Sequence, residues 1–440
     1  MPRRKSKRRK LTTINNAPHK ADNFFKKNCE TFMRFITYIL LLLICALMPL
    51  SAGAQQRTAQ SREVPAPKAK PAPKEQKVPM KSQRSTSSQN VPPAASAVVR
   101  PRVFLNPGHG GHDSDDRPCP FFNEGMQARV EYYESDSNLK CAMAMQDILR
   151  ERGYEVFMSR VNNTTADDLN LFEIHQLALN SGADVFFSIH SNSSGSSRRV
   201  NFPFVIYRGY DGAEAAEGSE YLASIVASNL ADMEATSWSR GGLIHGDWTF
   251  YRSRSGLGVF RWNKLPGVLS ENCFHDYQIE RERLLNKDYC WLLGMINSRS
   301  LDKFFARPAQ KFGEVAGLVR FDYPRKGKKL KAYGKDAYQP QNGVPVELCD
   351  LDGNPIQTYH IDNYNNGFYC FTRVRPGRYL VAIDGVEDHE VEVKADKTTY
   401  YNVTIITQPQ TEDYLDDITV VHTQEPEPDE TVISNGEEAQ

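Results

Sequence analysis

Between residues 100 and 308, short apolar runs alternate with longer segments in which apolar residues recur every three or four positions. The short runs predict buried β-strands, and the longer period predicts helices with one apolar face. Regular alternation of the two predicts an α/β domain with a mostly parallel sheet and helices on both faces. The expected strands are residues 103–105, 154–158, 183–189, 204–207, 259–261 and 267–270, and the expected helices are 134–152, 167–181, 213–231 and 277–305.

From residue 313 to residue 406 the pattern changes to short alternating runs separated by turn dipeptides such as Asn342-Gly343 and Pro376-Gly377. This spacing predicts a small antiparallel β-sandwich. No catalytic constellation is visible in this region, so we expect a spacer, a stabilising module or an adhesive module. The expected strands are residues 315–321, 344–348, 367–372, 379–383, 390–393 and 400–405.

Residues 35–50 form an uninterrupted apolar run that is short for a membrane-spanning helix. Its basic flank and the following Ala52-Gly53-Ala54 predict a secretory signal over residues 1–54, cleaved after Ala54. Met33 lies just before the run, and we expect translation to start there. The alternative is an uncleaved anchor. Either way the chain is expected to be exported, to the periplasm or the cell envelope, and to meet a membrane only through this segment.

Charge is concentrated outside the two predicted domains. The chain has 54 basic and 54 acidic side chains, and this zero net charge argues against a general nucleic-acid binder. Residues 55–99 are rich in Pro, Lys, Ser and Gln and predict a disordered linker, while 407–440 hold ten acids without Lys or Arg and predict a disordered tail. The basic run at 3–10 could be a nucleic-acid patch, but the signal sequence behind it argues against this.

Six of the eight cysteines follow the predicted signal, and no Cys-x-x-Cys pair occurs. A structural zinc–thiolate site is therefore unsupported. Export permits disulfides, and Cys349 with Cys370 is the most plausible pair, because both lie in the small C-terminal region. The sequence does not choose among the possible pairings.

Polar motifs follow the predicted strands of the α/β domain, at the edge where open sheets of this type bind ligands. His109 lies in a glycine-rich turn after the first strand, Glu134 begins the first long helix, and His190 ends the most apolar strand. Two histidines and a carboxylate are the ligand set of a catalytic zinc, which leaves a fourth position for water. Glu271, on a later strand, could act as general base toward that water.

Each of these signals is weak alone, since acids stabilise helix starts without any metal and strand-end histidines are common. Their combination resembles the zinc-dependent N-acetylmuramoyl-L-alanine amidases of the amidase-3 type. The similar blocks are residues 106–111 (NPGHGG), 134–139 (ESDSNL), 188–192 (SIHSN) and 259–274 (VFRWNKLPGVLSENCF), together with Arg160. The C-terminal region is similar to carboxypeptidase-regulatory or transthyretin-like modules.

The resemblance implies that a zinc ion is held by His109, Glu134 and His190, and that Glu271 is the catalytic acid/base. The implied reaction is hydrolysis of the amide between N-acetylmuramic acid and L-alanine of the peptidoglycan stem peptide, by zinc-activated water. Residues 100–308 would form the amidase domain. The residues expected to contact the peptidoglycan substrate are Asn192, His112 and Arg261.

Several positions depart from the family pattern. Asn106 replaces an aspartate, which would change the hold on His109. Residues 113–127 are unlike the family and could form a lid, and residues 240–257, with His245, are expected to be a surface loop. Glu131 and Glu124 are alternative metal ligands. A non-catalytic wall-binding module that keeps the fold is the alternative function, and a protein activator is left open.

Overall fold

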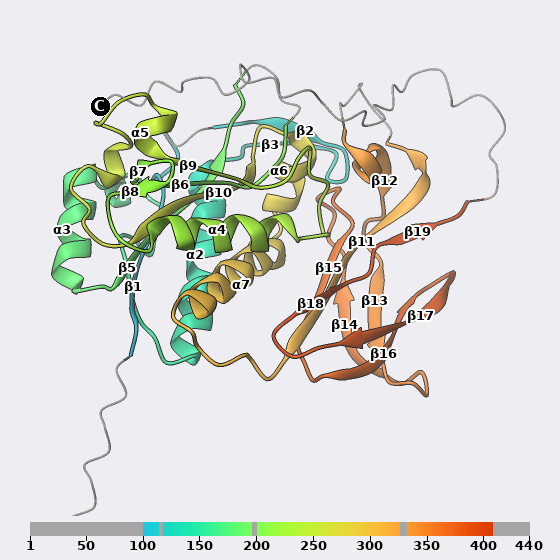
Figure 1. The fold of residues 1–440 in the computed structure, drawn as a ribbon. Coiled ribbons are helices and arrows are strands. Elements are labelled where there is room, and N and C mark those ends of the chain that lie inside the picture. Colours follow the sequence, from blue (N-terminus) through green and yellow to red (C-terminus); the bar gives the residue numbers. More distant parts are fainter. Residues whose placement is uncertain (1–99, 114–117, 196–199, 326–331, 408–440) are drawn as a thin grey trace, which may run out of the picture. The chain divides into compact units, whose positions relative to one another are not determined.

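The computed structural model describes residues 100–113, 118–195, 200–325 and 332–407, all within one compact unit of the chain (Figure 1). The predicted signal, the predicted linker and the predicted tail from residue 408 on lie outside these residues. Among the described helices, none combines the length and the apolar character needed to cross a bilayer.

A six-stranded sheet forms the centre of the first domain and confirms the predicted fold class. Its first four strands are parallel, and the last two run in the opposite direction, because β6 pairs antiparallel with β10 while β9 is parallel to β6. The strand order is β4 (Glu155–Met158), β1 (Arg102–Pro107), β5 (Val185–Asn192), β10 (Gly267–Phe274), β6 (Phe204–Tyr207) and β9 (Leu243–Gly246).

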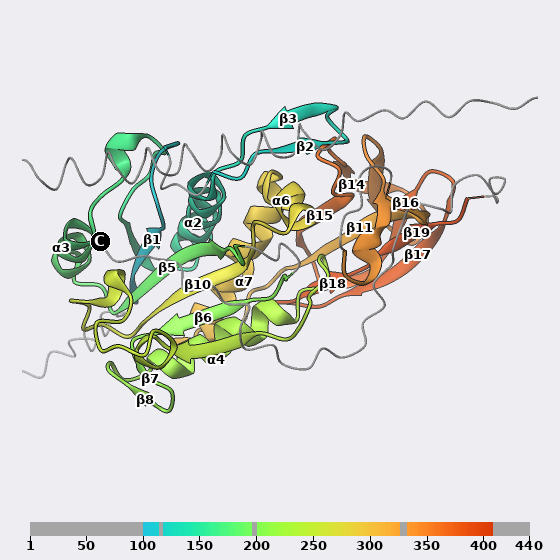
Figure 2. The same ribbon diagram turned by 90° about the horizontal axis from the view of Figure 1, so that it is seen from above.

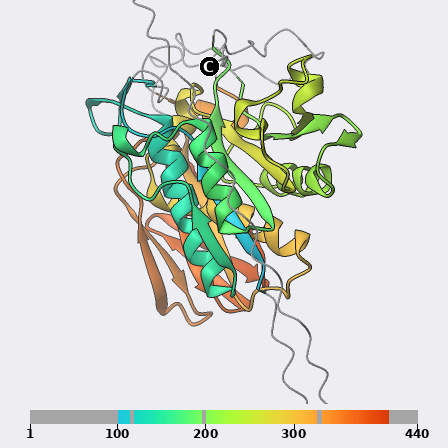
Figure 3. The ribbon, with the colours of Figure 1, turned by 90° about the vertical axis from the view of Figure 1, so that its left-hand side faces the viewer.

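Helices cover both faces of this sheet, as the alternation of strand and helix predicts. Side chains such as Leu105 and Phe187 pack into one core with α2 (Glu134–Glu151), α4 (Ser219–Ala231) and α7 (Lys287–Phe304). Neighbouring side chains such as Phe104 and Phe186 point the other way, toward α3 (Leu171–Ser181). Figure 3 shows the ribbon from the side on which α3 lies in Figure 1. Because successive strand residues face opposite sides, apolar residues at every position of these strands bury both faces.

Three predicted elements are wrong in extent or type. Residues 259–261 are not a strand, because Val259 and Phe260 are buried in the turn η2 (Gly258–Phe260) against the α3 face. The predicted helix 277–305 is two helices, α6 (Gln278–Leu284) and α7, since the Asn286 side chain accepts hydrogen bonds from the first amides of α7. The predicted helix 213–231 begins only at α4, after Gly218 in the left-handed region (φ 91°).

The segment predicted as a surface loop, 240–257, contains the edge strand β9 and the short helix α5 (Asp247–Phe250). Two small hairpins border the domain. They are β7 (Gly209–Tyr210) with β8 (Ala213–Glu214), and β2 (Phe121–Asn123) with β3 (Ala128–Val130). The second hairpin lies in the region that sequence reasoning considered a lid.

The C-terminal module consists of two sheets around a separate core, as predicted. One contains β11 (Gly313–Pro324), β12 (Tyr338–Pro340), β15 (Phe368–Val374), β18 (Thr398–Tyr400) and β19 (Val403–Ile405); the other contains β14 (Pro355–His360), β13 (Pro345–Cys349), β16 (Gly377–Ile383) and β17 (Val386–Val393). The module is not wholly antiparallel, because β18 and β19 both pair parallel with β11.

Besides its own core, the module packs one face of its first sheet against the hydrophobic core of the α/β domain. Leu318, Phe368 and Cys370, on the outer face of the first sheet, belong to the same buried cluster as Leu292 and Leu293 of α7. The predicted disulfide is therefore wrong. Cys370 faces α7, while its neighbours Tyr369 and Phe371 face the module core. None of the six described cysteines is in a disulfide.

Candidate metal centre

Three side chains from three different elements meet at the carboxyl ends of the parallel strands. His109 lies in the loop after β1, Glu134 is the first residue of α2, and His190 is near the end of β5. One ligand atom from each lies within 4.8 Å of the other two. The Glu134 oxygens lie 3.4 Å from His109 Nε2 and 3.1 Å from His190 Nδ1.

The glycine-rich turn after β1 allows this convergence. A Cβ atom on Gly108 would overlap the His190 ring, so only glycine leaves room for the imidazole. His109 adopts φ 60°, a left-handed conformation that costs a non-glycine residue energy and that functional sites often retain. Arg160 holds the turn against the start of α2, since it donates to the carbonyl oxygens of Pro107, Gly108 and Ser135 at 2.9–3.0 Å.

Glu134 is held as a buried anion. Burial by itself raises the pKa of its carboxyl, but the charge and hydrogen bond of His109 and the hydrogen bond of His190 outweigh it, so the pKa lies well below its usual range. The carboxylate also accepts hydrogen bonds from Asn138 Nδ2 and from the Ser191 amide, both at 3.0 Å. Its position at the start of α2 adds the favourable field of the helix N-terminus.

The donor set of this cluster fits a zinc ion. Imidazole nitrogen and carboxylate oxygen are both common zinc ligands, and catalytic zinc sites use three protein ligands. The side chains are 4–16% exposed, so the cluster is largely shielded but reachable from solvent. The site predicted from the sequence is therefore assembled by the fold, and it is the one cluster of this kind among the described residues.

Glu271 lies beside the cluster on the neighbouring strand. It pairs in register with His190 across the parallel strands β10 and β5. Paired residues on adjacent strands project to the same side of a sheet, so both side chains leave the sheet on the same face. Glu271 as a whole is half-buried, and its Oε2 atom is shielded from solvent.

The residues predicted to contact substrate lie in different places. The His112 ring stacks on Tyr133 (centroids 4.5 Å apart), and its Nε2 is 2.9 Å from Asp136 Oδ1, within the first turn of α2. Asn192 ends β5, two residues after His190. Arg261 follows η2 in the loop that leads into β10, and its guanidinium lies 5.6 Å from the centre of the Trp262 ring.

Other sequence expectations about the site turn out differently. The Asn106 side chain ties three strand ends together: its amide nitrogen donates to Ser188 Oγ and its oxygen accepts from Ser159 Oγ, both at 2.8 Å. Neither alternative ligand joins the cluster, because Glu131 pairs with Arg129 at 3.2 Å and Glu124 lies at the tip of the β2–β3 hairpin.

Sequence reasoning missed His275, which is buried behind Glu134. Its Nδ1 lies 3.7 Å from Glu134 Oε2 and donates to the Ser191 carbonyl oxygen at 2.8 Å. Burial lowers the pKa of His275 and outweighs the nearby Glu134 carboxylate, so the ring is neutral at pH 7. His275 lies only four residues after Glu271 in the sequence, and this closeness could have suggested that it belongs to the site.

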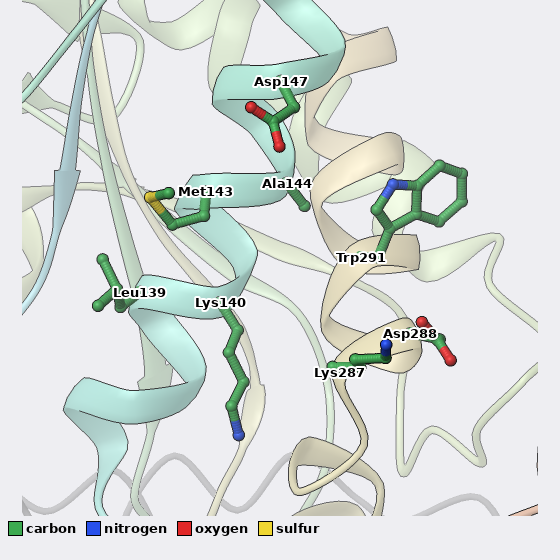
Figure 4. A pocket seen from close by; sticks show the side chains of 8 residues that line it. All are labelled: Leu139, Lys140, Met143, Ala144, Asp147, Lys287, Asp288 and Trp291. Carbon is green, nitrogen blue, oxygen red and sulfur yellow. The ribbon is translucent and has the colours of Figure 1, made fainter. Parts of the chain in front are cut away.

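A separate pocket of about 390 Å³ lies between α2 and α7 (Figure 4). Its lining includes Lys140 and Met143 of α2 and Lys287 and Trp291 of α7. None of the residues that line it belongs to the histidine–glutamate cluster, so it is distinct from the candidate metal centre.

Comparison with known proteins matches the domain that carries this cluster. Residues 103–293 match the family described as N-acetylmuramoyl-L-alanine amidase (amidase-3). The sporulation-specific N-acetylmuramoyl-L-alanine amidase of Bacillus subtilis (strain 168) is 25% identical over 205 residues, which are 46% of this chain and 68% of that protein. An uncharacterized protein, YqiI, of the same strain is 29% identical over 198 residues, covering 44% of this chain and 81% of its own length.

Solved structures of amidases also match this region. The N-acetylmuramoyl-L-alanine amidase from Clostridium difficile 630 has 25% sequence identity and a TM-score of 0.38, covering 47% of this chain and 97% of its own. The family match ends within α7, so the C-terminal module lies outside it. The similarity to the amidase-3 family is thus confined to residues 103–293.

Proposed function

We propose that this chain is a zinc-dependent N-acetylmuramoyl-L-alanine amidase that cleaves the amide between N-acetylmuramic acid and L-alanine in peptidoglycan. The observation that carries the proposal is the convergence of His109, Glu134 and His190 at one point, with Glu271 in register beside them. The family match of the same residues supports the reaction type.

His109, Glu134 and His190 would hold the zinc ion, which as a Lewis acid would polarise the scissile carbonyl and lower the pKa of water to about 7. Glu271 would accept a proton from the attacking water and return it to the L-alanine nitrogen, because an amine is a poor leaving group without a proton. Glu134, whose pKa is well below its usual range, would stay ionised throughout.

The substrate would lie along the rim of the cluster. His112 has its ring fixed by Asp136 and Tyr133 and half exposed, so one ring nitrogen can meet a peptidoglycan group. Asn192 is placed to contact the same substrate from the end of β5. For Arg261 the support is weaker, since it lies before β10 and not beside the cluster.

We further propose export to the periplasm or the cell envelope, where peptidoglycan is found. The apolar run at residues 35–50, with its basic flank and Ala-x-Ala end, supports this. Mass spectrometry of the mature N-terminus would test it, with cleavage after Ala54 as the expected result.

The decisive test replaces Glu271 by Gln. We expect the release of stem peptide from purified muropeptides, followed by mass spectrometry, to fall about 10²- to 10⁴-fold, because the acid/base is lost while the zinc ligands remain. Zinc content should stay at that of the wild type. Glu155→Gln is the matched control, since that exposed carboxylate pairs with Arg102 at the amino end of β4, opposite the edge that carries the cluster. A wild type that binds zinc but releases no stem peptide would instead favour a non-catalytic wall-binding module.

A further inference from the structure

The β2–β3 hairpin is tied at its base to the residues that precede the metal cluster. The Cys119 amide donates to the Tyr132 carbonyl oxygen at 2.8 Å, just beyond the end of β3. The Tyr132 hydroxyl bonds Ser137 Oγ at 2.7 Å in the first turn of α2. Glu134 follows two residues after Tyr132, so the hairpin leads directly into the metal centre.

The tip of the same hairpin is fixed on the C-terminal module. Asn123 is fully buried, and its side-chain amide donates to the Tyr364 carbonyl oxygen at 2.8 Å. Gly125 lies so close to the module that a Cβ atom there would overlap the Asn363 carbonyl oxygen and lie 2.9 Å from the Asn365 nitrogen. Figure 2 shows the hairpin extending from the start of α2 to this side of the module.

Helix α6 fills the space between the hairpin and the module. Arg281 donates to the Cys119 carbonyl oxygen at 3.1 Å, and its guanidinium lies 4.6 Å from the centre of the Phe121 ring. On the module side, Glu282 pairs with Arg325 at 2.7 Å. The tip of the hairpin and the helix beside its base are therefore both attached to the module.

A buried ionic network makes this attachment rigid. Arg283 of α6 is 1% exposed and pairs with Glu280 at 2.7 Å and with Asp336 of the module. Glu280 accepts a hydrogen bond from Asn201 Nδ2, and Asn201 Oδ1 accepts one from the Phe274 amide, both at 3.0 Å. Phe274 ends β10, three residues after Glu271.

We propose that the C-terminal module is a fixed wall of the amidase site. By holding hairpin β2–β3 in place, it sets the position of the surface on which peptidoglycan lies next to His109, Glu134 and His190. Phe122 on this hairpin is 49% exposed, and Arg129 is exposed as well, so both can meet the substrate. The inference rests on the proposed amidase function, and it replaces the expected spacer by a part of the site.

Gly125→Val tests the contact directly, because the new side chain cannot fit against Asn363 and Asn365. We expect KM for soluble muropeptides to rise about ten-fold, while kcat stays within about two-fold and zinc content is unchanged. Gly241→Val is the matched control, since a Cβ atom at that position would meet nothing within 4 Å. A purely structural role would instead reduce the folded fraction, which lowers apparent kcat and leaves KM unchanged.

Asn123→Asp is the second variant, for use if Gly125→Val fails to fold. It keeps the oxygen that accepts from the Met126 amide but loses the donor to Tyr364, and we expect the same rise in KM. Unchanged KM in the folded variants would overturn the role of the module while leaving the amidase intact. A wild type without amidase activity would overturn the proposed function itself, and this inference with it.

Discussion

Two clusters of buried charged side chains are built in opposite ways: the network around Arg283 of α6, and the cluster of His109, Glu134 and His190. In the network around Arg283, the acids Glu280 and Asp336 are fully buried, and each has an arginine partner. In the candidate metal centre, the Glu134 carboxylate contacts the imidazoles of His109 and His190, and the side chains are up to 16% exposed.

This difference favours a structural role for the network around Arg283 and a metal-binding role for the cluster of His109, Glu134 and His190. A buried charge that is fully paired keeps its own partners and has no capacity for another ion. A buried carboxylate whose neighbours are imidazoles would be stabilised further by a bound cation. The three predictions below test this contrast from the largest expected effect to the smallest.

Replacing His190 by Ala should have the largest effect, because it removes one of the three zinc ligands. We expect amidase activity to fall at least about a thousand-fold and zinc to be lost from the purified protein. Stripping the wild type with a chelator should give the same loss, and added zinc should restore the wild type alone. Activity that survives in the zinc-free wild type would contradict the metal centre.

Replacing Arg283 by Met should leave the zinc site able to bind but destabilise the fold. Glu280 and Asp336 would remain buried with fewer partners, and we expect the free energy of unfolding to fall by about 3–5 kcal/mol. Urea unfolding followed by circular dichroism measures this. Arg378→Ala is the control, because its pair with Glu390 at 2.5 Å is exposed and should leave the midpoint unchanged.

Acid should weaken the same network by a smaller amount. Burial raises the pKa of Asp336, but Arg283 and Arg320 outweigh it, so the pKa in the folded protein is lowered. A lowered carboxyl pKa contributes stability above the unfolded value of about 3.9, and this is lost as pH falls through the folded pKa. The stability difference between wild type and Asp336→Asn should therefore shrink below about pH 4. A constant difference between pH 7 and pH 3 would argue against this assignment.

Much of the α/β fold follows from local patterns in the sequence. The strands β1, β5 and β6 and the helix α2 were predicted close to their observed positions, because each has a continuous apolar run or stripe with clear end signals. Convergence of His109, Glu134 and His190 was also predictable, since the carboxyl ends of parallel strands meet at one edge of a sheet.

The features that depend on distant contacts could not be predicted in this way. Val259 and Phe260 are apolar and buried like strand residues, but they lie in the turn η2 and pack against the core on the α3 side. His275 becomes part of the site only because β10 ends beside β5. The position of the module depends on contacts of Asp336 with α6 and of Asn363 with the hairpin. Contacts between residues so far apart in the sequence leave no local pattern from which to predict them.

The absence of disulfides among the described cysteines has a consequence for the folding of this chain. Burial raises the pKa of the Cys290 thiol to about 11 and also raises that of Cys273, so neither forms the thiolate needed for exchange at neutral pH. The native state therefore requires no oxidant and no disulfide isomerase. We expect a reductant to leave the refolding yield of the protein unchanged. The fold would then form equally well in oxidising and in reducing surroundings.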